Sequence, residues 1–209
     1  MRNPDLASPE LGAVEVHGIN RASFILRGAL TAGAVLGATA VGPYVSNAFA
    51  ASGSGDIDIL NFALTLEYLE TAFYQTKGKT VGLSGEAKTL ATMFGEEEAE
   101  HVVALTKAIT SAGGKPVKKP TFSFPVTNQA SFLKLAYVLE NTGVGAYNGA
   151  GPSLVNKTYL AAAGSIVQVE ARHAASIALL TGAMITPDGA FDKPLSKKQV
   201  LAAAGPLIK

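Results

Sequence analysis

The chain reads FGEEEAEH at residues 94–101 and IVQVEARH at residues 166–173. Each stretch ends in a histidine with a glutamate three residues before it, as in the pair Glu98 and His101. On an α-helix, residues three apart lie on the same face, so one metal ion can contact both side chains. These stretches therefore predict two helices that each carry a Glu-x-x-His pair.

The two stretches belong to a repeat of two halves. A further glutamate precedes each Glu-x-x-His pair on an earlier helix, Glu67 in the first half and Glu140 in the second. A tyrosine follows each of these glutamates about two helical turns later, Tyr74 and Tyr147 respectively. One helical hairpin used twice predicts a site with pseudo-twofold symmetry.

Helical periodicity begins after Gly55 and predicts four long helices. We expect them near residues 57–77, 85–112, 128–148 and 154–183, with a short helix near 196–204. Short turns join the first helix to the second and the third to the fourth, so each pair should form an antiparallel hairpin. Residues 113–127 hold three prolines and cannot be helical. At roughly 3.3 Å per residue this segment can cross the whole bundle. The expected fold is all-α, a four-helix bundle with a long crossover between its second and third helices.

The glutamates and histidines of the repeat lie on apolar helix stripes, so we expect them in the core. Glu98 and His101, for example, lie on one stripe with Phe94 and Leu105. An unpaired ion in the core costs several kcal/mol. Two divalent cations with two neutral imidazoles would balance four buried carboxylates, which predicts two metal ions roughly 3.5–4 Å apart.

The composition narrows the chemistry of such a site. The chain has no cysteine, which excludes disulfides, thiolate zinc sites, iron–sulfur clusters and a cysteine nucleophile. Nitrogen and oxygen ligands remain, and these suit iron, manganese or zinc. The formal net charge is +1, so no charge excess favours nucleic acid as a partner.

One glutamate from each of two helices, with Glu-x-x-His from the other two, is the pattern of di-iron and di-manganese carboxylate bundles. The strings LNFALTLEYLETAFY, GEEEAEH, LEN and VEARH make residues 57–183 resemble the ferritin-like superfamily. Within it, they are similar to the secreted ferritin-like group that includes desiccation-related proteins. The resemblance implies two iron or manganese ions, with Glu98 and Glu170 as bridges. The ligands that it implies are Glu67, Glu98, His101, Glu140, Glu170 and His173.

Other polar side chains near the repeat have simpler explanations. Tyr74 and Tyr147 could be partners of the ligands or redox-active residues, but their place on apolar stripes already explains them as core aromatics. We interpret four further acidic residues as solvated helix charges: Glu70, Glu96, Glu97 and Glu100.

Residues 1–50 are typical of an export signal. Arg21 and Arg27 precede an uncharged run rich in alanine and glycine at residues 28–42. Residues 48–50 then read AFA, a small-x-small cleavage pattern. The run is short for a membrane span, which needs about 20 apolar residues. An ordinary amphipathic or core helix is the alternative interpretation.

The export segment also suggests a route and a location. NRASFILR at residues 20–27 resembles the twin-arginine motif, although Ala22 stands where that motif has its second arginine. We expect an exported protein, in the periplasm, in the cell wall or outside the cell, with membrane contact only if the segment is retained. The bundle is then expected at residues 51–185 and a C-terminal tail with a short helix at 186–209.

Two classes of function stay open at this point. A dimetal oxidoreductase, ferroxidase-like or peroxidase-like, would oxidise Fe(II) with O2 or destroy peroxide in protection against stress. The alternative is a non-catalytic role, as a metal-binding or structural bundle of the envelope or as an assembly subunit. The sequence leaves a homo-oligomer open in either case.

Overall fold

The computed structural model of the protein describes residues 55–209. The export segment predicted at residues 1–50, which includes His17, lies outside the described residues. The described part of the chain is helical, and its β-type pairing is limited to an isolated antiparallel bridge between Phe122 and Ile208. None of the helices in this part is both long enough and apolar enough to span a membrane.

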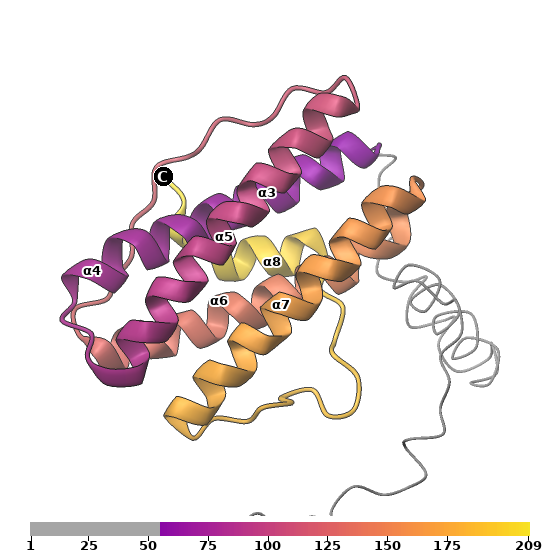
Figure 1. Ribbon diagram of the computed structural model, residues 1–209. Coiled ribbons are helices and arrows are strands. Elements are labelled where there is room, and N and C mark those ends of the chain that lie inside the picture. Colours follow the sequence, from indigo (N-terminus) through magenta and orange to yellow (C-terminus); the bar gives the residue numbers. More distant parts are fainter. Residues whose placement is uncertain (1–54) are drawn as a thin grey trace, which may run out of the picture. The chain divides into compact units, whose positions relative to one another are not determined.

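Four long helices form the bundle (Figure 1). They are α3 (Asp56–Ala72), α5 (Gly85–Ser111), α6 (Gln129–Ala150) and α7 (Lys157–Thr181). α3 packs along α5 and α6 packs along α7, and the two hairpins meet through α3 with α6 and α5 with α7. The crossover at residues 113–127 runs along the bundle from the end of α5 to the start of α6 (Figure 1). The predicted all-α bundle with a long crossover is confirmed.

The first helix extends further than predicted. After α3 the chain makes a π-helical turn, Phe73–Lys77, and a short helix α4, Gly78–Thr80. The turn to the second helix therefore begins after Thr80 and not after residue 77, where we expected the first helix to end. Phe73 and Tyr74 are both buried at this π-helical turn. Such turns appear mostly as single insertions in α-helices and frequently lie at functional sites.

A polar layer divides the apolar core of the bundle in two. Along α3, Leu60 and Leu64 belong to one apolar cluster and Phe73 to the other, with Glu67 between them. α5 runs antiparallel to α3 and shows the reverse order, because Phe94, of the Phe73 cluster, lies before its Glu-x-x-His pair and Leu105, of the Leu60 cluster, lies after it. Full burial of such a side chain contributes about 1.5–3 kcal/mol. Apolar packing on both sides therefore encloses the polar layer.

The C-terminal tail packs on α6. It carries α8 (Lys197–Ala204), which contacts α6, and the backbone N–H of Leu195 donates to the carbonyl of Gly145 at 2.8 Å. A Cβ atom at Gly149 would lie 2.1 Å from the carbonyl oxygen of Leu195. Only glycine allows so close an approach, so the composition of α6 decides where the tail can lie.

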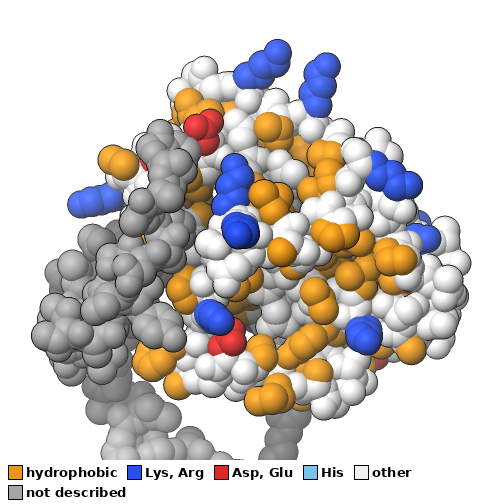
Figure 2. Space-filling view, turned by 180° about the vertical axis from the view of Figure 1, so that it is seen from behind, with side chains coloured by type: hydrophobic (Ala, Val, Ile, Leu, Met, Phe, Trp, Pro, Cys, Tyr) orange, Lys and Arg blue, Asp and Glu red, His pale blue; other side chains and the backbone are white. Residues whose placement is uncertain are grey.

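The outer surface is mixed in character. On the face shown in Figure 2, lysine and arginine side chains project at scattered points among apolar ones. Large exposed apolar residues such as Val155, Leu179 and Phe191 come from different parts of the chain. The strongest concentration of chemically active side chains in the described part is therefore internal, in the polar layer.

Candidate metal centre

The six predicted ligands converge in the polar layer. Atoms able to hold a metal ion fall into two groups, and within each group they lie within 4.8 Å of one another. The first group is Glu67, Glu98, His101 and Glu170, and the second is Glu98, Glu140, Glu170 and His173. Glu98 and Glu170 belong to both groups, while each histidine belongs to one. The structure thus brings together all six residues in a paired arrangement that shares two carboxylates.

Each helix delivers its side chains through the face that it turns to the core. α3 contributes Glu67 and α6 contributes Glu140, whereas α5 and α7 each contribute a Glu-x-x-His pair. All four glutamate side chains of the two groups are 0% exposed. Four carboxyl groups without access to water must be balanced by protons or by cations.

The imidazole of His101 faces three carboxylates at once. Its Nδ1 lies 3.0 Å from Oε2 of Glu98, 3.2 Å from Oε2 of Glu67 and 3.2 Å from Oε1 of Glu170. One ring N–H cannot donate well to three acceptors. The imidazole nitrogen and the three carboxylate oxygens therefore surround one shared position, as ligands of a metal ion do, and do not form three good hydrogen bonds.

In the described part of the chain, the imidazole of His173 has a hydrogen-bond partner at Nε2 and none at Nδ1. Its Nε2–H donates to Oε2 of Glu97 at 2.7 Å. Its Nδ1 lies 2.9 Å from Oε1 of Glu98 and 3.3 Å from Oε2 of Glu140, but neither contact is aligned as a hydrogen bond. With Nε2 protonated, the lone pair of Nδ1 faces two carboxylate oxygens, an unfavourable contact that a second proton or a cation on Nδ1 would relieve.

Five buried polar atoms of this layer have no hydrogen-bond partner among the described residues. They are Oε1 of Glu98, Oε2 of Glu140, both carboxylate oxygens of Glu170 and Nδ1 of His173. An unpaired buried polar group costs about 1–3 kcal/mol, and more when it is charged. Divalent cations held by these residues would supply partners in this layer, and a donor set of imidazole nitrogen and carboxylate oxygen suits iron or manganese. The residues present fit a pair of such cations.

The sequence pattern of the family described as "Ferritin-like domain" matches residues 55–183 of the chain, well over half of its length. The chain belongs to the ferritin-like domain family. The resemblance to the ferritin-like superfamily that the sequence suggests is confirmed. No curated protein matches the chain.

Two solved structures share the fold. One, from Bacillus anthracis str. Ames, is described as "ferritin like, diiron-carboxylate proteins"; it is 23% identical, with a TM-score of 0.52, over 60% of this chain and 94% of that one. The other, a conserved hypothetical protein from Mycobacterium tuberculosis, is 18% identical, with a TM-score of 0.56, over 64% of this chain and 94% of that one. At these identities the likeness shows the fold.

In this ferritin-like domain, burial controls the charge of the carboxylates. Burial, reinforced by the charge of Glu98, raises the pKa of Glu67 to about 8. Burial also raises the pKa of Glu140 and Glu170 above the ordinary range. Glu98 differs: burial opposes its charge, but the two histidine side chains beside it lower its pKa to about 2.

The histidines hold protons for the same reason. Burial disfavours the imidazolium, but the surrounding carboxylates outweigh it and raise the pKa of His101 to about 12 and of His173 to about 11. Without cations, both imidazoles and several carboxyl groups therefore keep their protons near neutral pH. Metal binding has to displace these protons, so it should weaken as the pH falls.

Glu70 is not a solvated charge, and that prediction was wrong. Its side chain is 3% exposed, and burial, with the charges of Glu170 and Glu98, raises its pKa well above the ordinary range. It lies beside Gly143, where an added Cβ would be 3.4 Å from Oε1 of Glu70 and 3.2 Å from Oε2 of Glu170. Gly143 is the counterpart of Glu70 in the repeat, so the small residue in one half leaves room for the large one in the other.

The other three acidic residues near the centre differ in whether they contact it. Glu96 and Glu100 are exposed, as predicted. Glu97 is 42% exposed but reaches from α5 to the imidazole of His173 on α7, so its interpretation as a purely solvated charge was wrong. No sequence pattern predicts this contact, because it depends on the separation of two helices.

The two tyrosines are partners of the candidate ligands. The hydroxyl of Tyr74 donates to Oε1 of Glu140, and that of Tyr147 donates to Oε1 of Glu67. Burial raises the pKa of both phenols well above the ordinary range, so both remain donors. Their rings also belong to the apolar clusters, so both interpretations hold. Each tyrosine serves the glutamate of the opposite half of the repeat.

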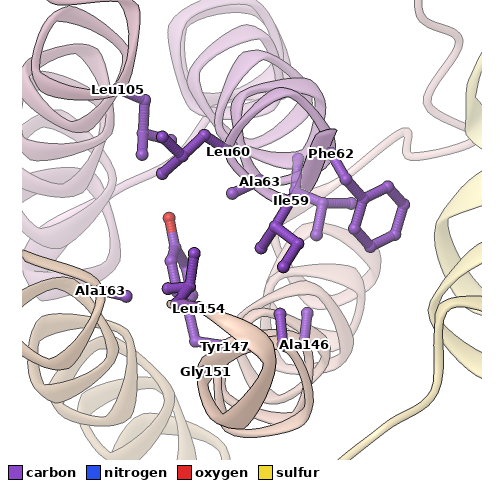
Figure 3. Close-up of a pocket in the computed structure, with 12 residues that line it drawn as sticks. Ile59, Leu60, Phe62, Ala63, Leu105, Ala146, Tyr147, Gly151, Leu154 and Ala163 are labelled. Carbon is purple, nitrogen blue, oxygen red and sulfur yellow. The ribbon is translucent and has the colours of Figure 1, made fainter. Parts of the chain in front are cut away.

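An apolar pocket adjoins the Glu67 side of the centre (Figure 3). Leu60, Leu105 and Ala163 line it together with the ring of Tyr147. In Figure 3 the hydroxyl of Tyr147 points toward the side of the pocket where Leu60 and Leu105 lie, and this hydroxyl donates to Glu67. One wall of the pocket is therefore a residue in contact with the centre.

Proposed function

We propose that this ferritin-like domain holds two ions of iron or manganese and acts as an oxidoreductase on Fe(II), O2 or peroxide in protection against stress. The observation that carries the proposal is the convergence of five buried polar atoms without partners. The proposed ligands are Glu67, Glu98, His101, Glu140, Glu170 and His173.

The proposed ligands fall into two sets, one for each metal position. Glu67 and His101 would hold one ion, Glu140 and His173 the other, and the two shared carboxylates would bridge them. Such a pair supplies Lewis-acid and redox chemistry at its open coordination positions. The tyrosine hydroxyls orient Glu67 and Glu140 by donating to one oxygen of each.

Access and proton supply have candidates on this chain. The apolar pocket beside Tyr147 suits a small apolar molecule such as O2, because it is lined almost entirely by hydrocarbon. Glu70 is buried beside Glu170, and its raised pKa keeps a proton on its carboxyl group to a higher pH than usual. Oε1 of Glu70 can therefore give a proton to the centre or take one from it.

Metal content and oxygen consumption test the proposal together. We expect about two ions per chain after anaerobic loading with Fe(II), followed by consumption of O2 or peroxide. Glu98→Ala should lose both ions, because both groups share Glu98. If the wild-type protein holds no more metal than Glu98→Ala, the dimetal proposal is wrong and a structural role replaces it. Two bound ions without turnover would instead support the non-catalytic metal-binding role.

We also propose that the protein is exported and that its mature form begins at Ala51. The support is the basic stretch, the apolar run and the AFA pattern of residues 1–50. Mass spectrometry of protein from the native envelope should find Ala51 as the first residue. Recovery of an intact N-terminus from that fraction would contradict cleavage.

A further inference from the structure

The repeat predicts that whatever surrounds one histidine should have a counterpart at the other. The pseudo-twofold relation pairs α5 with α7, and therefore His101 with His173. Glu97, which precedes Glu98, then corresponds to Val169, which precedes Glu170. Glu97 contacts His173, but the corresponding residue near His101 is Val169, whose side chain has no polar atom. His101 therefore has no equivalent hydrogen bond from the repeat.

The histidine of the second half is held on two sides. Glu97 accepts the hydrogen bond from Nε2 of His173 at 2.7 Å, and the ring of Phe94 stacks on the imidazole with a centroid separation of 3.9 Å. His173 is 2% exposed. These contacts fix the ring plane and turn Nδ1 toward Glu98 and Glu140.

The histidine of the first half is held less firmly. His101 is 12% exposed, and within residues 55–209 no hydrogen bond to its Nε2 is formed. The apolar pocket also lies on this side, since the hydroxyl of its wall residue Tyr147 donates to Glu67. The histidine of the first half is therefore the more exposed of the two.

We infer that the two metal positions are unequal, and that Glu97 is the positioning residue that makes them so. The position of Glu140 and His173 fills first and keeps its ion, whereas the position of Glu67 and His101 fills second and exchanges. The physical reason is that a partner on the outer nitrogen fixes the tautomer and orientation of a ligand histidine and makes it more basic. Loss of such a partner typically lowers metal affinity about 10–100-fold. The inference rests on the proposed dimetal function.

Titration of the full chain with Mn²⁺ alone tests the inference. The electron paramagnetic resonance signal of free Mn²⁺ gives the number of bound ions and the affinity of each step. We expect two steps in the wild-type protein, with affinities that differ about tenfold or more. Glu97→Gln should lower the affinity of the tighter step by about 10–100-fold and leave the weaker step unchanged. The two affinities then become more nearly equal.

Two further variants separate a specific role from a general one. Glu96→Gln removes the same charge from the exposed neighbouring position and should leave both steps unchanged. On a His173→Ala background, Glu97→Gln should have no further effect, because Glu97 acts through that imidazole.

The inference is overturned if Glu97→Gln leaves the tighter step unchanged, weakens both steps equally, or still acts when His173 is absent. A wild-type protein that binds no Mn²⁺ would be a different result, because it would contradict the proposed dimetal function itself.

Discussion

The hairpin of α3 with α5 and the hairpin of α6 with α7 carry the same ligand pattern in different surroundings. The first hairpin adds two acidic residues, Glu70 and Glu97, at positions where the second has Gly143 and Val169. Glu70 and Glu97 both contact or approach residues of the second hairpin. Pseudo-symmetry therefore applies to the candidate ligands, while the groups around them make the two halves unequal.

The largest effect should come from the two carboxylates that belong to both ligand groups, Glu98 and Glu170. Glu170→Ala should remove both ions, as Glu98→Ala should, because both groups contain these carboxylates. His101→Ala and His173→Ala should each remove one ion and leave the bundle folded. Elemental analysis of loaded protein checks this. One remaining ion in Glu170→Ala would show that this carboxylate serves a single position.

Removal of metal should reverse the pH dependence of stability. The pKa of Glu67 is about 8 in the folded metal-free protein, above its ordinary value of 4.5, so its stabilising proton is fully bound below pH 4.5 and is lost as the pH rises through 8. The raised pKa values of both histidines act in the same direction above pH 6.5. Glu98, with a pKa of about 2, acts oppositely, but only below pH 4.5.

We therefore expect the Tm of the metal-free protein to fall between pH 5 and pH 9 by roughly ten degrees. The metal-loaded protein should not fall in this way, because cations replace the protons. Differential scanning calorimetry with and without a chelator measures both. Parallel curves for the two forms would mean that the buried carboxyl groups do not exchange protons for metal.

The hydrogen bonds of Tyr74 and Tyr147 are the same in both halves of the repeat, because each tyrosine donates to the glutamate of the opposite half. Tyr74→Phe removes the donor to Glu140, and Tyr147→Phe removes the donor to Glu67. Each should cost about 1–3 kcal/mol, because a buried acceptor is left without its partner. In the Mn²⁺ titration each variant should weaken only the step of the glutamate that it contacts. Weakening of the step in the tyrosine's own half would contradict the crossed pairing.

The smallest effect should come from Glu70. Glu70→Gln removes a buried acid whose pKa is raised well above its ordinary range, so the Tm of the metal-free protein should fall less steeply as the pH rises. At pH 8 we expect a gain of about 1 kcal/mol, or a few degrees in Tm. Glu100→Gln is the matched control, because Glu100 is exposed. Equal slopes in both variants would mean that Glu70 takes no part in the proton balance.

Periodicity along the chain was sufficient for the bundle and for the six candidate ligands. A Glu-x-x-His pair on an apolar stripe must share a helix face, and that face must be buried, whatever the rest of the fold does. The length of the 113–127 segment and its prolines likewise required a crossover of some kind. These are local properties, which depend on the spacing of residues within one helix or one loop.

Contacts between helices were decided only by the tertiary structure. A charge at the edge of a stripe, such as Glu70, is buried only because Gly143 on another helix leaves it space. Glu97 meets His173, and Tyr147 meets Glu67, only because α5 lies beside α7 and α3 beside α6. Sequence spacing determines which face of a helix a residue occupies, but the neighbouring helix determines what that residue meets there.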